Sequence, residues 1–215
     1  MHTKYKMLFL KLFLIFLFHL AVASSSFTDL HSRLAAAHAA NCAVHTVTVT
    51  CTGRNVLPQS SSISKDKRDY RFDNNSKAFH GALNEHNFQD YVSMQWLSLR
   101  YNKLTTVGAK SFRHSWQLAT IDLSFNSIKK LPATLFRNNT ALKHFYCSNN
   151  LLTTIDQHIF QGLTMLTHVR LQNNRLAVVH PQAFASIVSL QELYLEQNRL
   201  ETAYWYALSS FSLEY

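Results

Sequence analysis

The sequence is poor in glycine and cysteine, and it has none of the common catalytic signatures. Only four glycines occur in 215 residues, and none of them builds a phosphate-binding loop. The metalloprotease pattern H-E-x-x-H and the hydrolase pattern G-x-S-x-G are absent. Cysteine occurs three times, at Cys42, Cys51 and Cys147, so at least one thiol has no partner within the chain. We therefore expect a protein that is not an enzyme and that uses no cofactor.

A long apolar run occurs once, at the N-terminus. Residues 7–20 are almost all apolar, two lysines precede them, and Ala21-Val22-Ala23 follows as a small-x-small site. This layout predicts a secretory signal peptide, residues 1–23, that is cleaved after Ala23. The alternative is an uncleaved membrane anchor, but the run is shorter than the roughly 20 residues of a spanning helix. We expect a secreted, extracellular chain with no membrane span after cleavage.

Positive charge is in modest excess. The formal net charge is +9, and loss of the three lysines of the signal peptide lowers it to +6. The densest basic stretch, KDKRDYR at residues 65–71, contains two aspartates and predicts a solvated loop. Because nucleic-acid binding needs basic residues clustered on one face, we expect no nucleic-acid partner.

Asparagine recurs in the second half of the chain at a constant spacing of 24 positions. The recurring asparagines are Asn102, Asn126, Asn150, Asn174 and Asn198. The same apolar positions return around each of them, as in residues 166–189, LTHVRLQNNRLAVVHPQAFASIVS. In each copy two apolar residues stand two positions apart, as Leu97 and Leu99 do, so both side chains share one face of a short strand. Copies that stack would form a parallel sheet with about 4.8 Å between strands.

Two further columns of this repeat have predicted structural roles. The recurring asparagine carries an amide that both donates and accepts, so it can bond backbone groups in the turn that leaves each strand. A phenylalanine returns on the opposite limb and predicts a stacked aromatic spine, formed by Phe112, Phe136, Phe160 and Phe184. Cys147 occupies the same column as Leu99 and Leu123, which predicts a buried and unreactive thiol.

The frame L-x-x-L-x-L-x-x-N-x-L resembles the leucine-rich repeat. Residues 94–213 are similar to five such repeats, the last degenerate, and residues 70–93 to an irregular first repeat. The resemblance implies an α/β solenoid curved like a horseshoe. Its parallel sheet would line the concave face, with irregular, 3-10 or short helical turns on the convex face. Six strands would give a face about 29 Å long.

The ends differ from the repeats. CAVHTVTVTCTGRNVLP, residues 42–58, resembles the N-terminal cysteine cap of extracellular leucine-rich repeat proteins, which implies a Cys42–Cys51 disulfide. Residues 42–69 would hold the cap and a polar loop, and residues 24–41 are compatible with a short helix. Residues 201–215 are rich in aromatics, and they would cap the stack, dock a partner or mark a shortened product.

Side chains that alternate with the buried pair should project from the concave face. Tyrosine, tryptophan and arginine are enriched at interface hot spots, which favours Tyr146, Arg170 and Tyr194, with Trp96 and Arg100 at the other end. The alternative is a solvated concave face, with binding on the convex side or at an edge.

His144 and His168 occupy equivalent positions on neighbouring strands, so their imidazoles should approach one another. We add them to the partner-binding face. They would also suit a pH sensor, a weak metal site or an enzyme that uses them. Two side chains are too few to hold a metal firmly, so we expect no metal and no enzyme.

The functional expectation combines these features with family resemblance. Sequons at Asn74 and Asn138 predict N-glycosylation of a secreted chain. The architecture is similar to secreted leucine-rich immune proteins of insects, although their C-terminal cysteine pair and coiled coil are lacking here. We expect a module that binds an extracellular protein or peptide in innate immunity. The alternative is a fragment or shortened relative of a cell-surface receptor ectodomain for adhesion, development or signalling.

Overall fold

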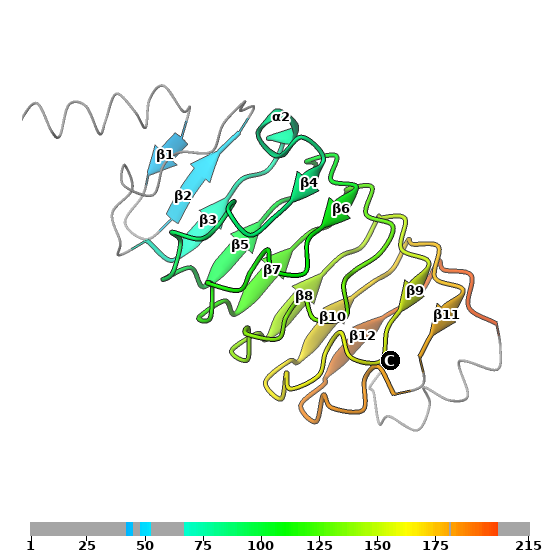
Figure 1. Cartoon of the computed structure of the whole chain (residues 1–215). Coiled ribbons are helices and arrows are strands. Elements are labelled where there is room, and N and C mark those ends of the chain that lie inside the picture. Colours follow the sequence, from blue (N-terminus) through cyan, green and yellow to red (C-terminus); the bar gives the residue numbers. More distant parts are fainter. Residues whose placement is uncertain (1–41, 45–47, 53–66, 181, 202–215) are drawn as a thin grey trace, which may run out of the picture.

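The computed structural model describes residues 42–44, 48–52, 67–180 and 182–201, which form an elongated stack of similar turns (Figure 1). The predicted signal peptide, the segment 24–41, most of the polar loop and the C-terminal segment 202–215 lie outside these residues. The described turns form the predicted solenoid, with a largely parallel sheet along one face.

That face is an eight-stranded sheet. Its strands, in spatial order, are β1 (Cys42–Val44), β2 (Thr48–Cys51), β3 (Asp69–Arg71), β5 (Trp96–Ser98), β7 (Thr120–Asp122), β8 (His144–Tyr146), β10 (His168–Arg170) and β12 (Glu192–Tyr194). β1 and β2 pair antiparallel, and all other neighbours pair parallel. The six predicted repeat strands run from β3 to β12, and the cap strands β1 and β2 extend the sheet to eight. At about 4.8 Å per strand, the count that gave 29 Å for six, the sheet is about 38 Å long.

The strands stack in a register that follows the sequence period. From β5 to β12 each residue lies beside the one 24 positions later, as Phe145 beside Val169. Between β3 and β5 the offset grows to 27 positions, with Tyr70 beside Leu97. The chain segment between these two strands includes helix α2 (Ser76–Phe79), so the additional length of this turn lies off the sheet.

The opposite limb contains short strands as well as the predicted turns (Figure 1). β4 (Ala82–Leu83) pairs with β6 (Thr106–Val107), and β9 (Thr154–Ile155) pairs with β11 (Val178–Val179), all in parallel. Each of these two-residue strands buries its second side chain, so the limb contributes apolar residues to the core. Turns make up most of the rest of this limb, and α2 is four residues long.

The basic stretch 65–71 is not the solvated loop that its charge predicts. In its described part, Asp69–Arg71 forms β3, Lys67 is buried, and the Tyr70 hydroxyl donates to the Lys67 carbonyl at 3.3 Å. Tyr70 and Phe72 bury their rings in the core, and this apolar alternation outweighs the surrounding charges.

The predicted disulfide is confirmed between Cys42 and Cys51, which lie opposite each other on β1 and β2. β2 continues the sheet beside β3, and Val49 and Cys51 are fully buried. The cap therefore covers the core of the first repeat, which would otherwise be exposed to water.

The core is a continuous apolar column under the sheet. Its inward-facing strand residues include Leu97, Ile121, Phe145 and Val169, all fully buried. Cys147 is a free thiol with no exposed surface, as its register with leucine predicts. Burial raises the pKa of the Cys147 thiol far above its usual range, so the reactive thiolate is suppressed.

The aromatic spine forms, but it is interrupted in the middle. Phe88, Phe112 and Phe136 stack in sequence with ring centroids 5.9 and 6.2 Å apart, and Phe160 stacks on Phe184 at 5.6 Å. Between the two segments lies Phe145 from β8, whose ring is 5.0 Å from Phe136 and 5.8 Å from Phe160. The Phe145 ring thus connects the two stacked segments of the spine.

The recurring asparagines form a hydrogen-bonded ladder at the ends of the strands. Asn150 is representative: its Nδ2 donates to the carbonyls of Leu123 at 3.0 Å and Cys147 at 3.3 Å. Its Oδ1 accepts from the amide of Ile128 at 3.0 Å. Each asparagine thus bonds its own turn and the preceding one. The ladder comprises Asn102, Asn126, Asn150, Asn174 and Asn198, and Asn75 extends it toward the cap.

The burial of Cys147 gives a first testable prediction. Iodoacetamide should not label this thiol in the folded protein, because the thiolate is suppressed and the sulfur has no solvent access. Mass spectrometry before and after denaturation measures the labelling, which should be stoichiometric only in the denatured chain. Rapid labelling of Cys147 without denaturant would contradict a buried position.

The ladder gives a second prediction. Asn150→Asp keeps the shape of the side chain but replaces its donor by an acceptor, which removes the Nδ2 hydrogen bonds and sets a carboxylate oxygen against the buried carbonyls of Leu123 and Cys147. We expect a loss of about 2–5 kcal/mol in unfolding free energy, measured by urea denaturation. Asn149→Asp is the matched control, because Asn149 lies outside the ladder and aspartate tolerates its left-handed backbone. Equal effects of the two substitutions would show that the ladder does not stabilise the fold.

Candidate partner-binding face

Arg170 lies between two tyrosine rings on the exposed face of the sheet. The register places Tyr146, Arg170 and Tyr194 side by side on β8, β10 and β12. The guanidinium carbon of Arg170 is 5.1 Å from the centroid of each ring, within the range of a cation–π interaction. The structure therefore brings the three favoured hot-spot residues into one cluster.

Glu192 completes this cluster, although the sequence did not single it out. Its two carboxylate oxygens lie 3.6 Å from an Arg170 guanidinium nitrogen and 3.5 Å from Nε2 of His168. The available signal was its position, because Glu192 follows His144 and His168 in the same column of the repeat. The name "tyrosine–arginine cluster" is used below for Tyr146, Arg170, Tyr194, His144, His168 and Glu192.

The two histidines meet as their register predicts. Their ring centroids are 4.8 Å apart in an edge-to-face arrangement. Nδ1 of His144 lies 2.9 Å from the Thr120 hydroxyl, and Nδ1 of His168 lies 2.8 Å from the Thr167 hydroxyl. Each imidazole is therefore oriented by a threonine, and the pair lines one side of the cluster.

His144 is held toward its neutral form. Partial burial is the main cause that lowers its pKa, and the neighbouring charges of His168, Lys143 and Arg170 act in the same direction. Glu192 opposes them. The His144 imidazole is therefore uncharged at neutral pH.

Trp96 and Arg100, predicted at the other end of the face, belong to two separate groups. The guanidinium carbon of Arg71 lies 4.9 Å from the Trp96 ring, a contact between β3 and β5 that the sequence did not reveal. Nε of Arg100 lies 3.7 Å from the Asp122 carboxylate. Neither residue contributes to the tyrosine–arginine cluster.

Polar groups in this N-terminal half are largely bonded to one another. Asp73 accepts from the Ser98 hydroxyl at 2.6 Å and from the Arg100 amide at 2.9 Å. Asp122 accepts from the Ser124 amide at 2.8 Å. Burial raises the pKa of Asp122, and the bonds to Ser124 and the charge of Arg100 counteract that rise.

After each repeat strand one residue has a left-handed backbone conformation, and these residues form a column along the edge where the strands end. Its members have φ between 54° and 59° and are Asn74, Tyr101, Phe125, Asn149, Asn173 and Gln197. Asparagine tolerates this conformation, whereas aromatic side chains rarely adopt it, at a cost of roughly 1–2 kcal/mol per residue. Tyr101 and Phe125 nevertheless stack at 4.6 Å, with the Arg100 guanidinium 5.4 and 4.9 Å from their centroids.

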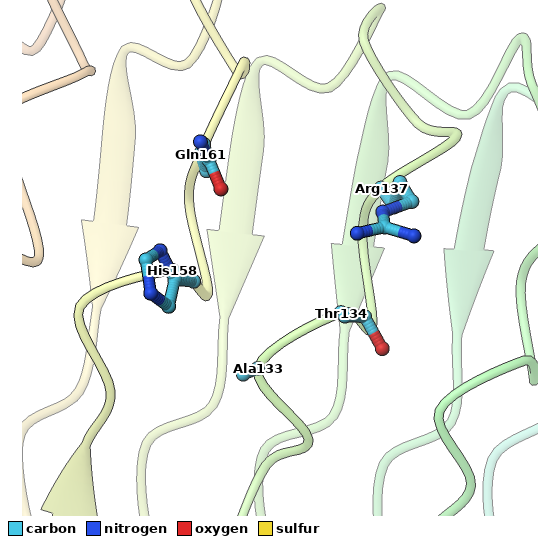
Figure 2. Close-up of a pocket in the computed structure, with 5 residues that line it drawn as sticks. All are labelled: Ala133, Thr134, Arg137, His158 and Gln161. Carbon is cyan, nitrogen blue, oxygen red and sulfur yellow. The ribbon is translucent and has the colours of Figure 1, made fainter.

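A separate pocket lies between two loops of the return limb. It is lined by Ala133, Thr134, Arg137, His158 and Gln161, and Figure 2 shows their side chains on neighbouring loops in front of the sheet. Its lining combines one guanidinium and one imidazole with neutral groups.

Among the described ranges, no group of three or more His, Cys, Asp or Glu side chains could hold a metal ion. Within the same ranges, no helix has the length and apolar character to cross a membrane.

Comparison with protein families decides the identity of the fold. The family model described as "Leucine rich repeat" matches residues 79–128, 116–176 and 164–215, more than half of the chain. The chain belongs to the leucine-rich repeat family. Curated protein sequences gave no match.

Solved leucine-rich repeat structures share the fold. The leucine-rich repeat domain of APL1 superimposes with a TM-score of 0.59 at 23% identity, over 63% of this chain and 35% of that one. Toll, in the Toll–Spatzle complex described as a hub in Drosophila development and innate immunity, gives 0.58 at 28% identity, over 68% and 23%. A TLR13–ssRNA13 complex gives 0.50 at 20%, over 68% and 24%.

These neighbours are longer than the present chain, which spans about a quarter to a third of each of them. At 23% and 20% identity the likenesses to APL1 and TLR13 show the fold alone.

The lowered pKa of His144 gives a third prediction. The unfolded chain binds a proton at this residue at a higher pH than the folded chain does. Stability should therefore fall as the pH drops through the unfolded pKa of about 6.5 toward the lower folded value. His144→Gln removes this dependence, so its melting temperature should fall less than that of the wild type between pH 7.5 and pH 5. Parallel melting curves for the two proteins over that range would contradict the prediction.

Proposed function

We propose that this leucine-rich repeat chain binds a protein or peptide through the tyrosine–arginine cluster. One observation carries the proposal: Arg170 is held between Tyr146 and Tyr194 on neighbouring strands, with its charge still exposed. Tyrosine and arginine supply much of the binding energy at protein interfaces. Strand backbones fixed by stacking keep the cost of ordering these side chains low.

The polarity of the cluster favours a partner with both charged and aromatic groups. Arg170 offers donors to a carboxylate, Glu192 accepts from a cation, and the tyrosine rings offer apolar faces with hydroxyl groups. A polynucleotide that bound Arg170 on this face would also meet the carboxylates of Glu192 and of the exposed Glu196. Repulsion of phosphates by these carboxylates is the reason for proposing a protein partner.

The setting that we propose is extracellular, and the process is innate immunity. The signal peptide predicted at residues 1–23 supports secretion. The likeness to Toll in the Toll–Spatzle complex supports an immune setting, since its described role includes innate immunity.

A shortened or partial receptor ectodomain is the second candidate. The likeness to Toll, over 68% of this chain and 23% of that one, favours it. A coding segment downstream at the genomic locus, read through in transcripts, would support this candidate over a separate secreted protein.

The fourth prediction tests the binding face. The chain, expressed with its own leader and immobilised, should capture a partner from extracellular fluid. Replacing Tyr146, Arg170 and Tyr194 by alanine should abolish that capture. With the captured partner purified, calorimetry on Arg170→Ala alone should show an affinity loss of at least about 30-fold, as expected for a hot spot.

Two variants serve as controls for this experiment. Arg170→Lys keeps the charge but loses the planar group that stacks, so most of the affinity should still be lost. Trp116→Ala with Arg137→Ala changes exposed residues outside the cluster and should leave capture intact. Unchanged capture by the triple variant, or loss of capture with the Trp116 and Arg137 changes alone, would reject this face.

A further inference from the structure

Tyr101 and Phe125 form an exposed aromatic stack at positions that disfavour aromatic side chains. Both residues have a left-handed backbone, at which other repeats place Asn149, Asn173 or Gln197. Tyr101 remains 45% exposed, so burial in the core does not account for its presence there. Strained residues of this kind concentrate at sites where a ligand or partner is held.

The neighbour of Tyr101 in this column is a sequon asparagine. The longer offset between β3 and β5 places Asn74 beside Tyr101, and the Asn74 amide donates to the Arg100 carbonyl at 3.0 Å. Phe125 lies on the other side of Tyr101, in the next turn of the solenoid. The side of Tyr101 away from Phe125 therefore faces the exposed Asn74.

The backbone around Asn74 is held firmly. Asp73, the residue before it, accepts hydrogen bonds from Ser98 and from the Arg100 amide. Asn75, the residue after it, donates its amide to Oδ1 of Asn102 at 2.6 Å. A group attached to Asn74 would thus leave the surface at a defined place next to Tyr101, with little further ordering.

We propose that Asn74 carries an N-linked glycan whose first sugar packs against the exposed face of Tyr101. The C–H face of a pyranose is apolar and matches an aromatic ring, while its hydroxyl groups stay in water. The stack on Phe125 holds the Tyr101 ring in place. This inference rests on the proposed secretion of the chain and not on the proposed partner binding.

The second sequon lacks such a platform. Asn138 is exposed and its side chain donates to the Arg113 carbonyl at 3.2 Å. Its neighbours in the repeat register are His114 and Gly162. A glycan on Asn138 would meet no stacked aromatic pair in its column, so this site serves as an internal control.

A glycan on Asn74 would leave the tyrosine–arginine cluster accessible. Asn74 follows β3, and β8 lies three strands away, which is about 14 Å at the usual strand spacing. The sugar would instead cover the rim beside β3 and β5, where polar groups already bond to one another.

A double-mutant cycle on secreted protein tests the proposal. Ser76→Ala removes the sequon while Asn74 stays in place, and Tyr101→Asn installs the residue found at Asn149 and Asn173, so that variant should fold. Mass spectrometry of the glycopeptide reports occupancy of Asn74. Loss of the glycan should lower the melting temperature by roughly 2–4 °C with Tyr101 present and by close to nothing in the Tyr101→Asn background.

The control removes the other sequon by Thr140→Ala in both backgrounds. Its shift in melting temperature should be the same whether tyrosine or asparagine occupies position 101. An unoccupied Asn74 would overturn the proposal. Equal shifts for Ser76→Ala in the two backgrounds would overturn it as well, because the glycan would then be attached without contacting Tyr101.

Discussion

Hydrogen bonds between neighbouring turns at the strand ends are the interaction on which the rest of this molecule depends. Each repeat strand is three residues long, and the chain then leaves the sheet with backbone groups still buried. The ladder asparagines satisfy those groups across two turns at once, as when Asn174 Nδ2 donates to the Cys147 carbonyl at 2.9 Å. An unpaired buried group is costly, so each turn is stable only in register with its neighbour.

This requirement explains where the repeat tolerates irregularity. The turn between Asn75 and Asn102 is three residues longer than the others, yet Asn102 Nδ2 still donates to the Phe72 carbonyl at 2.8 Å. The three additional residues lie on the return limb, where backbone groups can hydrogen-bond to water or to nearby groups of the same turn. The sheet side remains in register, and its outward side chains therefore form regular columns across all repeats.

Those columns determine how much of the candidate site follows from sequence. Side chains one repeat apart lie side by side, so the burial of Cys147, the approach of His144 to His168 and the grouping of Tyr146 with Arg170 could all be predicted. The ion pairs of Glu192 and the contact of Arg71 with Trp96 could not, because a position in a column does not determine side-chain conformations across strands. The burial of Lys67 was missed because the charges of residues 65–71 predicted a solvated loop, even though Tyr70 and Phe72 follow the pattern of a repeat strand. The inserted Phe145 ring reflects packing that periodicity does not encode.

The two halves of the sheet face differ in what a partner would have to displace. In the N-terminal half, Asp73 already accepts short hydrogen bonds from Ser98 and the Arg100 amide, and a ligand would have to replace them. In the C-terminal half, Arg170 and Glu192 are paired at 3.6 Å with 45% and 38% of their side chains exposed. Exposed ion pairs contribute only about 0–1 kcal/mol, so exchange of this pair for partner groups costs little. The tyrosine rings lie on both sides of Arg170 and would keep it in place during that exchange, which is why we propose the C-terminal half as the place where a partner binds.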